Sequence, residues 1–305
     1  MTGMMLCSIV LGLGIGLVST LSPMVISETF SGEEQSTVLG LSTGTTSLGG
    51  MLMMALGGYL GANDWRLLFW VFLFGVPVFL TILLCLPKDE IAKGKRVSSK
   101  QPKTSFIHLL RSLNPYTIFV YLAVFILVLA INAYMANLSL VIVEKKMGDT
   151  ATTGFINAIG SLGGIVAGFG FSLIRRFTKP HTLALGLVGL SLSLLITFFA
   201  RSTVFMGLSG ILWGIAMVSV MASSPFLLSM LSKPEQIPVV MSIFAVINGL
   251  AGALAPKIMS MFGVATGTPS ILFGALISLI AGAILLMSRF GYRAENGLLL
   301  QNNGN

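Results

Sequence analysis

Residues 88–115, KDEIAKGKRVSSKQPKTSFIHLLRSLNP, form the one long hydrophilic stretch in a chain that is otherwise a series of apolar runs. Three apolar runs precede this stretch and six follow it. Its basic residues are Lys88, Lys93, Lys95, Arg96, Lys100, Lys103 and Arg111. Connections this rich in Lys and Arg are typical of the cytoplasmic side of membrane proteins. We therefore expect residues 88–115 to be a cytoplasmic linker between two groups of membrane helices.

The flanking apolar runs are each long enough to cross a bilayer, which takes about 20 residues of helix. They cover residues 4–26, 38–62, 66–87, 116–143, 151–174, 181–200, 203–231, 238–262 and 268–288. The hydrocarbon core holds no water to satisfy backbone groups, so each run is expected to be helical. The sequence thus predicts an all-α polytopic membrane protein with about nine transmembrane helices.

The composition supports this class. Of the 305 residues, 55% are hydrophobic and only 9% are charged, whereas soluble domains carry about 25% charged residues. A water-facing surface cannot be covered with so few charges. The formal net charge is +8, and the expected topology explains it without a nucleic-acid partner. The lipid bilayer itself is the expected environment.

Alternating the spans from the basic linker sorts the cations by side. Six more fall on the cytoplasmic side: Arg175, Arg176, Lys179, Lys233, Arg289 and Arg293. Five fall outside: Arg66, Lys145, Lys146, Arg201 and Lys257. This asymmetry follows the positive-inside rule. It predicts a multi-pass protein of the plasma membrane whose central loop and C-terminus are cytoplasmic.

An internal repeat relates the two ends of the chain. An offset of 202 residues aligns Ser22-Pro23 with Ser224-Pro225, and it also aligns Glu33 with Glu235 and Gly50 with Gly252. The first three spans therefore correspond to the last three, as in transporters built from parallel repeats. On a plan of two six-helix bundles, the three helices before the first span are expected to be absent.

This plan divides the chain into four parts. A truncated N-terminal bundle of three helices covers residues 1–87, and the basic cytoplasmic linker covers residues 88–115. A complete C-terminal six-helix bundle covers residues 116–293. A polar tail covers residues 294–305.

Three features resemble the major facilitator superfamily: the long basic loop between two halves, the segment Asp64-Trp65-Arg66-Leu67-Leu68-Phe69 before the third span, and the glycines of the second span. Drug-proton antiporters of that family carry Gly-x-x-x-Gly-Pro-x-x-Gly-Gly in their fifth helix. The present chain keeps Gly49, Gly57 and Gly58 but has Met53-Met54 at the central Gly-Pro. The resemblance covers the family's fourth to twelfth helices.

The resemblance implies a transmembrane transporter that carries small, largely neutral organic molecules by alternating access, with drug or metabolite efflux as one form. A coupling proton is a further expected partner, although no Asp or Glu lies in the middle of a predicted span. A second hypothesis stays open. Under that hypothesis, the chain is a non-transporting truncated remnant, or a membrane binding or scaffold protein that needs the missing helices.

Polar residues inside the predicted spans are the candidate substrate contacts, because an amide in hydrocarbon is costly unless it has a partner or lines water. Plain interhelical hydrogen bonding or core packing is the alternative for each. Two pairs have particular support: Tyr134 and Asn137 share a helix face, and the repeat relates Asn248 to Thr46. The cavity candidates are Thr46, Asn132, Tyr134, Asn137, Asn157, Trp213 and Asn248.

A second group of residues is expected to shape or gate the helices. Its prolines bend helices in some membrane proteins and are merely tolerated in others. Its glycines and charged residues come from the family pattern. The group consists of Pro23, Gly49, Gly57, Gly58, Asp64, Arg66, Pro225 and Pro256.

Enzymatic function is not expected. Gly40-Leu41-Ser42-Thr43-Gly44 matches a nucleophile-elbow pattern, but the elbow needs a strand that a helical span lacks. Ser209 lies in a Gly-x-Ser-Gly segment, yet both histidines, His108 and His181, lie outside the spans. No cofactor and no metal site are predicted.

Overall fold

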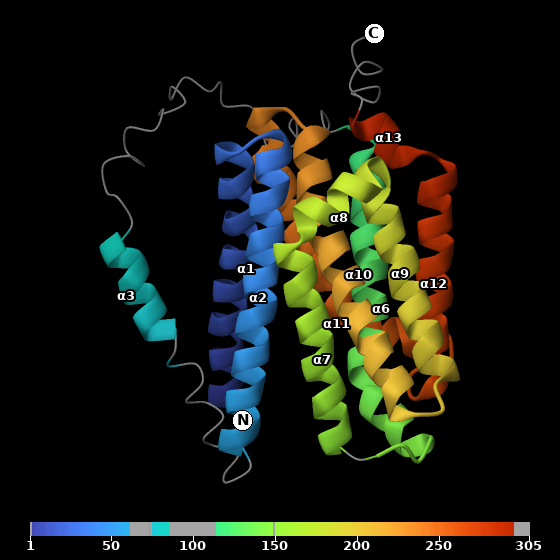
Figure 1. The fold of residues 1–305 in the computed structure, drawn as a ribbon. Coiled ribbons are helices and arrows are strands. Elements are labelled where there is room, and N and C mark those ends of the chain that lie inside the picture. The colour runs from blue at the N-terminus through green and yellow to red at the C-terminus, as the bar shows by residue number, and fades with distance from the viewer. Residues whose placement is uncertain (1, 62–72, 74, 86–113, 149, 296–305) are drawn as a thin grey trace. The chain divides into compact units, whose positions relative to one another are not determined.

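The computed structural model describes residues 2–61, 73, 75–85, 114–148 and 150–295. All regular secondary structure in these residues is helical, as predicted (Figure 1). Two compact units are present: Met1–Leu48 with Leu113–Asn305, and Gly49–Ser112. The central linker and the tail fall almost wholly outside the described residues, as do Asp64 and Arg66.

The first unit contains the helices α1 (Thr2–Thr29), the first half of α2 (Gly32–Gly61), and α6 to α13. These later helices are α6 (Thr117–Glu144), α7 (Thr150–Phe169), α8 (Phe171–Thr178), α9 (Thr182–Phe199), α10 (Thr203–Met230), α11 (Ile237–Met261), α12 (Thr268–Met287) and α13 (Phe290–Glu295). Two 3₁₀ turns, η2 (Lys179–His181) and η3 (Pro234–Gln236), precede α9 and α11. The second unit holds the rest of α2 and α3 (Gly75–Cys85).

Seven helical segments of the described residues are long and apolar enough to cross a membrane, which agrees with the prediction of about nine spans. They are Ile9–Thr29, Thr117–Glu144, Thr152–Phe169, Phe171–Phe199, Thr203–Met230, Pro234–Met261 and Thr268–Met287. Of the other two predicted spans, residues 38–62 lie almost wholly within α2. Most of residues 66–87 lies outside the described part, and α3 covers the end of that range.

One predicted span differs from the structure, because the fifth was expected to run through Gly170 to residue 174. The chain instead breaks at Gly170, and the short helix α8 begins at Phe171.

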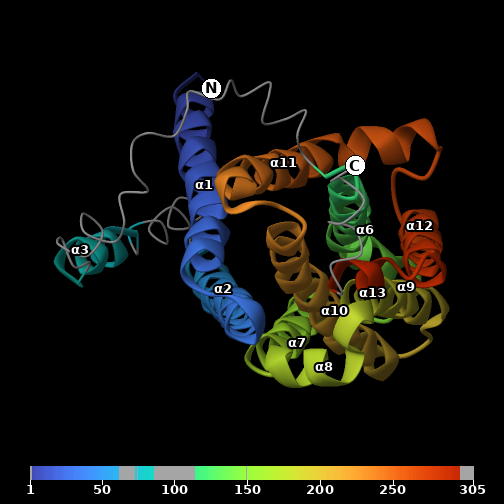
Figure 2. The same ribbon diagram turned by 90° about the horizontal axis from the view of Figure 1, so that it is seen from above.

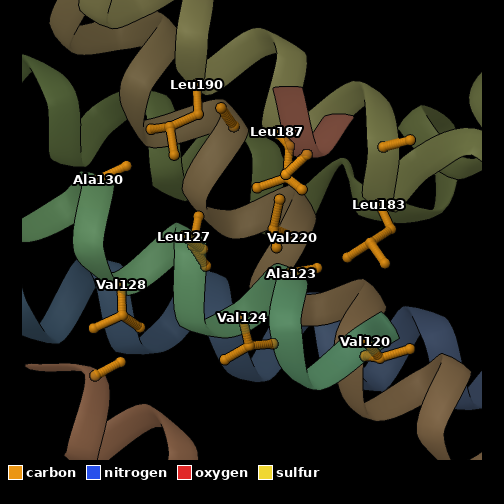
Figure 3. Packing of buried hydrophobic residues seen from close by; sticks show 14 of the residues in the cluster. Val120, Ala123, Val124, Leu127, Val128, Ala130, Leu183, Leu187, Leu190 and Val220 are labelled. Carbon is orange, nitrogen blue, oxygen red and sulfur yellow. The ribbon is translucent and has the colours of Figure 1, made fainter. Parts of the chain in front are cut away.

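A single apolar core joins α6, α9 and α10. Its fully buried members include Val124 and Leu127 of α6, Leu187 and Leu190 of α9, and Val220 of α10. Figure 3 shows these side chains gathered between the three helices. The branched residues of one helix fill the spaces between those of the next, so this core sets the spacing of the bundle.

Close backbone contacts at glycines bring α7 against both α10 and α2. A Cβ atom on Gly214 of α10 would lie 2.0 Å from the Gly160 carbonyl oxygen of α7. A Cβ atom on Gly168 of α7 would lie 2.2 Å from the Gly44 Cα of α2. Small residues allow such approach between membrane helices, which associate through packing rather than through the hydrophobic effect.

The C-terminal end of α6 caps two neighbouring helices with charges of opposite sign. Glu144 Oε2 accepts a hydrogen bond from Thr268 Oγ1 at 2.8 Å, at the first residue of α12. The Lys145 ammonium donates to the carbonyl oxygens of Thr197 at 2.9 Å and Ala200 at 3.1 Å, and to that of Phe198. An acid at a helix N-terminus and a cation at a C-terminus both complement the helix dipole.

The environment of Lys145 also affects its protonation. Desolvation by burial lowers the pKa of its ammonium below the ordinary value for lysine, and the neighbouring Glu144 carboxylate opposes that shift. This role could not be predicted from the sequence, because Lys145 and Lys146 look alike as residues of an outer loop. Only Lys145 reaches the end of α9.

The glycine contact predicts opposite effects for two Gly→Ala changes. Gly214→Ala should lower the free energy of unfolding by about 1–3 kcal/mol, because the added methyl group overlaps the backbone of α7. Gly249→Ala in α11 should be neutral or stabilising by up to about 1 kcal/mol, since no described atom lies within 4 Å of that position. Thermal unfolding in detergent measures both. Equal effects of Gly214→Ala and Gly249→Ala on thermal unfolding would contradict this explanation of the glycine contact.

The cap predicts a difference between adjacent lysines. Lys145→Met should destabilise the protein by about 1–2 kcal/mol, because it leaves carbonyl groups at the end of α9 without a donor. Lys146→Met, at an exposed position in the same turn, should change stability by less than about 0.5 kcal/mol. The same thermal measurement compares them, and a Lys146→Met loss as large as that of Lys145→Met would refute the assignment.

Candidate functional site

The polar candidates inside the first unit fall into two classes, those with satisfied side chains and those with buried polar atoms that have no partner. Buried polar groups are nearly always hydrogen-bonded in folded proteins, so an unpartnered one needs an explanation. In membrane proteins such groups often mark a path for substrate or ions. The two classes therefore separate structural residues from candidates for binding.

Asn137 belongs to the satisfied class. Its side chain is buried and its Nδ2 donates to the Ala133 carbonyl and to Ser270 Oγ, each at 3.0 Å. Its Oδ1 accepts from the Gly267 backbone N–H at 2.7 Å. Gly267 has a φ of +72° and adjoins Glu144, so it suits glycine alone. Asn137 thus fixes the start of α12, which favours the interhelical-bonding alternative over a substrate contact.

Asn132 and Thr46 bond within their own helices. Asn132 Nδ2 donates to the Val128 carbonyl at 2.9 Å, one turn earlier in α6. Thr46 Oγ1 donates to the Ser42 carbonyl at 2.9 Å, and Thr46 is exposed. Asn248 of α11 is half-buried and has no hydrogen bond to another described residue. The role of Thr46 and Asn248 as substrate contacts stays a prediction.

Tyr134 of α6 and Trp213 of α10 belong to the unpartnered class and lie together. Their rings stack with centroids 5.2 Å apart and planes 20° apart. Tyr134 is 1% exposed and Trp213 is 5% exposed. The Trp213 Nε1 has no hydrogen-bond partner in the described part of the chain. The Tyr134 hydroxyl has none within hydrogen-bond geometry either, although the side chain of Ser209, whose hydroxyl is bonded to Met206 and Thr197, lies near it. We call these two residues the aromatic pair.

The aromatic pair lies well inside the membrane segment. Tyr134 is ten residues from the end of α6 and Trp213 is ten residues from the start of α10, which places both about 15 Å from that end of the bundle. Gly160 of α7 lies beside the Trp213 ring, where its Cβ would be 3.6 Å from Cε3. Both residues were cavity candidates from the sequence, but only the fold shows that their rings stack.

Asn157 of α7 also has an unpartnered buried atom, Oδ1. It shares a stripe with Ser161, Gly164 and Gly168, whose spacing repeats every three or four residues. Further along this stripe, Gly164 lies against Ser47 and Gly168 against Gly44 of α2. That part of the stripe is a helix-packing face, the alternative expected from sequence. Asn157 is the polar residue at the other end of the stripe.

The prolines lie inside their helices: Pro23 in α1, Pro225 in α10 and Pro256 in α11. Pro225 is buried, Pro23 half-buried and Pro256 exposed. Gly49, Gly57 and Gly58 all lie in the second unit within α2.

Two further observations concern chemistry. The Ser209 hydroxyl donates to the Met206 carbonyl at 2.8 Å and accepts from Thr197 Oγ1 at 2.9 Å, so it ties α10 to α9. Ser193 and Thr197 of α9 are both buried and bond to Ser209 of α10. Among the described residues, no group of three or more His, Cys, Asp and Glu side chains could hold a metal ion.

A further polar contact joins the N-terminal helices to α10. The Gln35 Nε2 of α2 donates to Ser27 Oγ of α1 at 2.9 Å and to Ser229 Oγ of α10 at 2.7 Å. The 202-residue repeat relates these two serines to each other. Gln35 is buried. Sequence analysis aligned the serines but did not identify the amide that connects them.

Removing each asparagine by an isosteric change should separate the two classes. Asn137→Leu should lower the free energy of unfolding by about 2–4 kcal/mol, because it strands several buried donors and acceptors. Asn157→Leu should leave stability unchanged or raise it by about 1 kcal/mol, since it removes an unsatisfied atom. Thermal unfolding in detergent compares the two. A large loss for Asn157→Leu would assign it a structural role instead.

The comparisons with known proteins agree with the fold. The sequence model of the Major Facilitator Superfamily matches residues 1–177, more than half of the chain. No curated protein matches it. Members of the family are membrane transporters rather than enzymes, and the helices described above make this an integral membrane protein of that kind. The chain belongs to the Major Facilitator Superfamily.

Proposed function

We propose that the protein transports small, largely neutral organic molecules that contain an aromatic ring, by alternating access of its helix bundles. The observation that carries the proposal is the aromatic pair, Tyr134 and Trp213, with two buried polar atoms that lack partners. Each such atom costs about 1–3 kcal/mol of stability. A ligand that accepts hydrogen bonds from both would offset that cost.

The chemistry of the aromatic pair suits this class of substrate. Stacked rings favour planar apolar groups through dispersion and offset stacking. The Trp213 N–H is a donor only, and the Tyr134 hydroxyl can donate or accept. No Asp, Glu, Lys or Arg stands in α6 before Glu144, or anywhere in α10. A neutral molecule with one or two acceptor atoms is therefore favoured over an ion.

Transport requires the aromatic pair to become accessible, because both rings are buried in this structure. A rearrangement that separates α6 from α10 would expose them. Sites of repeat-based transporters lie near the bilayer midplane and open to each side in turn. We place the end of the bundle that bears α8 and α13 in the cytoplasm, since Arg175, Arg176 and Arg293 lie there (Figure 1).

Uptake into liposomes tests the proposal with paired probes. The 305-residue chain is reconstituted, and entry of an aryl glucoside is compared with entry of methyl glucoside, both neutral and poorly permeant. We expect flux of the aryl compound alone. Tyr134→Phe should reduce that flux about three- to tenfold, because it removes one hydrogen bond worth about 0.5–1.5 kcal/mol.

Tyr121→Phe is the matched control. Tyr121 lies on the same helix, and its hydroxyl donates to the Val240 carbonyl at 3.1 Å, so it has a structural partner. Loss of the Tyr121 hydroxyl should lower the stability of the protein and leave the aryl-glucoside flux within twofold of that of the unchanged protein. Absence of flux for both glucosides, or equal effects of the two Tyr→Phe changes, would count against the aromatic pair as the binding site. Measuring flux in both directions distinguishes efflux from uptake.

A further inference from the structure

A polar cavity of about 460 Å³ lies at the end of the first unit where α2 begins and α8 lies (Figure 1). Two helices supply its polar walls. Glu33, Ser36 and Thr37 come from the first turns of α2. The remaining residues, from α8 and η2, are Ser172, Leu173, Arg175, Arg176 and Lys179.

The cavity is basic. Arg175, Arg176 and Lys179 contribute three positive charges and Glu33 contributes one negative charge. Ser172 and Arg176 are four residues apart on α8 and share a face, and Lys179 follows at the start of η2. Glu33 forms no ion pair with Arg176 or Lys179 in the described part of the chain. With three positive charges and one negative charge, the lining is net positive.

Backbone contacts hold the walls in place. A Cβ on Gly40 of α2 would lie 2.4 Å from the Cβ of the fully buried Phe171, so α8 begins directly against α2. At the other end of the wall, Gly291 of α13 packs against the Pro180 carbonyl. The Arg175 guanidinium lies 3.5 Å from the centroid of the Phe226 ring of α10. The cations are thus attached to a fixed frame rather than to a free loop.

The helix α8 also places the cavity at the membrane surface. Leu173 and Phe177, four residues apart on α8, are 57% and 81% exposed. Exposed apolar residues beside cations on one short helix are typical of the boundary between headgroups and acyl chains. Figure 2 shows α8 at the periphery of the first unit, beside α7. A group bound in the cavity is then within reach of either lipid or the aqueous phase.

We propose that this cavity binds a phosphate group, carried by an anionic lipid headgroup or by a soluble phosphate. Guanidinium groups bind phosphate oxygens through paired N–H donors, and lysine adds a point charge. Basic pockets between membrane helices are known to bind anionic headgroups. Ser172 and Thr37 add hydroxyl donors to the same space. The proposal is independent of the transport activity proposed above.

Binding is tested with the full chain in a neutral detergent, through the shift in its unfolding temperature. Dihexanoyl phosphatidic acid is compared with dihexanoyl phosphatidylcholine, and inorganic phosphate with chloride at equal ionic strength. A saturable shift with phosphatidic acid alone identifies a lipid headgroup, and one with inorganic phosphate alone identifies a soluble ligand. Shifts with both identify the phosphate group itself. No saturable shift with either phosphate probe overturns the proposal.

Variants then locate the site. Arg176→Gln and Lys179→Gln should each weaken binding about tenfold. Lys233→Gln, which removes an exposed cation outside the cavity, should leave the affinity within twofold. Glu33→Gln should strengthen binding several-fold, because it removes the one negative charge of the lining. Misfolding can explain a loss of affinity in Arg176→Gln or Lys179→Gln, but it cannot explain a gain of affinity in Glu33→Gln. Equal losses of affinity for the phosphate probe in Lys233→Gln and Arg176→Gln would mean that the overall positive charge of the protein attracts the probe. That result would refute the proposed site.

Discussion

The contact between the backbones of α7 and α10 holds the first compact unit together, because lipid gives membrane helices no hydrophobic reason to associate. Gly160 and Gly214 let the two helices approach until backbone atoms touch. Dispersion between closely packed atoms then supplies the attraction. The same device recurs about two turns further along α7, at Gly168 and Gly44. Small residues along α7 thus let it contact two neighbours, α10 and α2.

Polar groups are used sparingly in this bundle and mostly at helix ends. Asn137 and Glu144 fix the start of α12, and Lys145 closes the end of α9. Within the spans, hydroxyl groups such as those of Ser193 and Ser209 join α9 to α10. Asn157, His181, Ser232 and Ser278 also have a buried polar atom without a partner in the described part of the chain. The unpartnered atoms of Tyr134 and Trp213 differ in that they belong to two stacked rings.

Helix positions in this chain could be predicted from the sequence, and many polar roles could not. The length and hydropathy of each run determine where a membrane helix lies, so α6, α10, α11 and α12 end within one residue of their predicted bounds. The break at Gly170 was missed because glycine is common inside membrane helices. Asn137 and Asn157 look equivalent in the sequence. Their difference depends on which neighbour lies opposite, such as Gly267, and that is a property of the packed bundle.

The bond that Gln35 makes to Ser27 and Ser229 shows how the two related halves have diverged. The repeat preserves the serines, but the position equivalent to Gln35 is Ile237, so only one half provides the donor. A single amide thereby joins the two serines that the repeat relates. The two repeat-related segments are complementary at this contact, because each brings a serine and only one brings the donor.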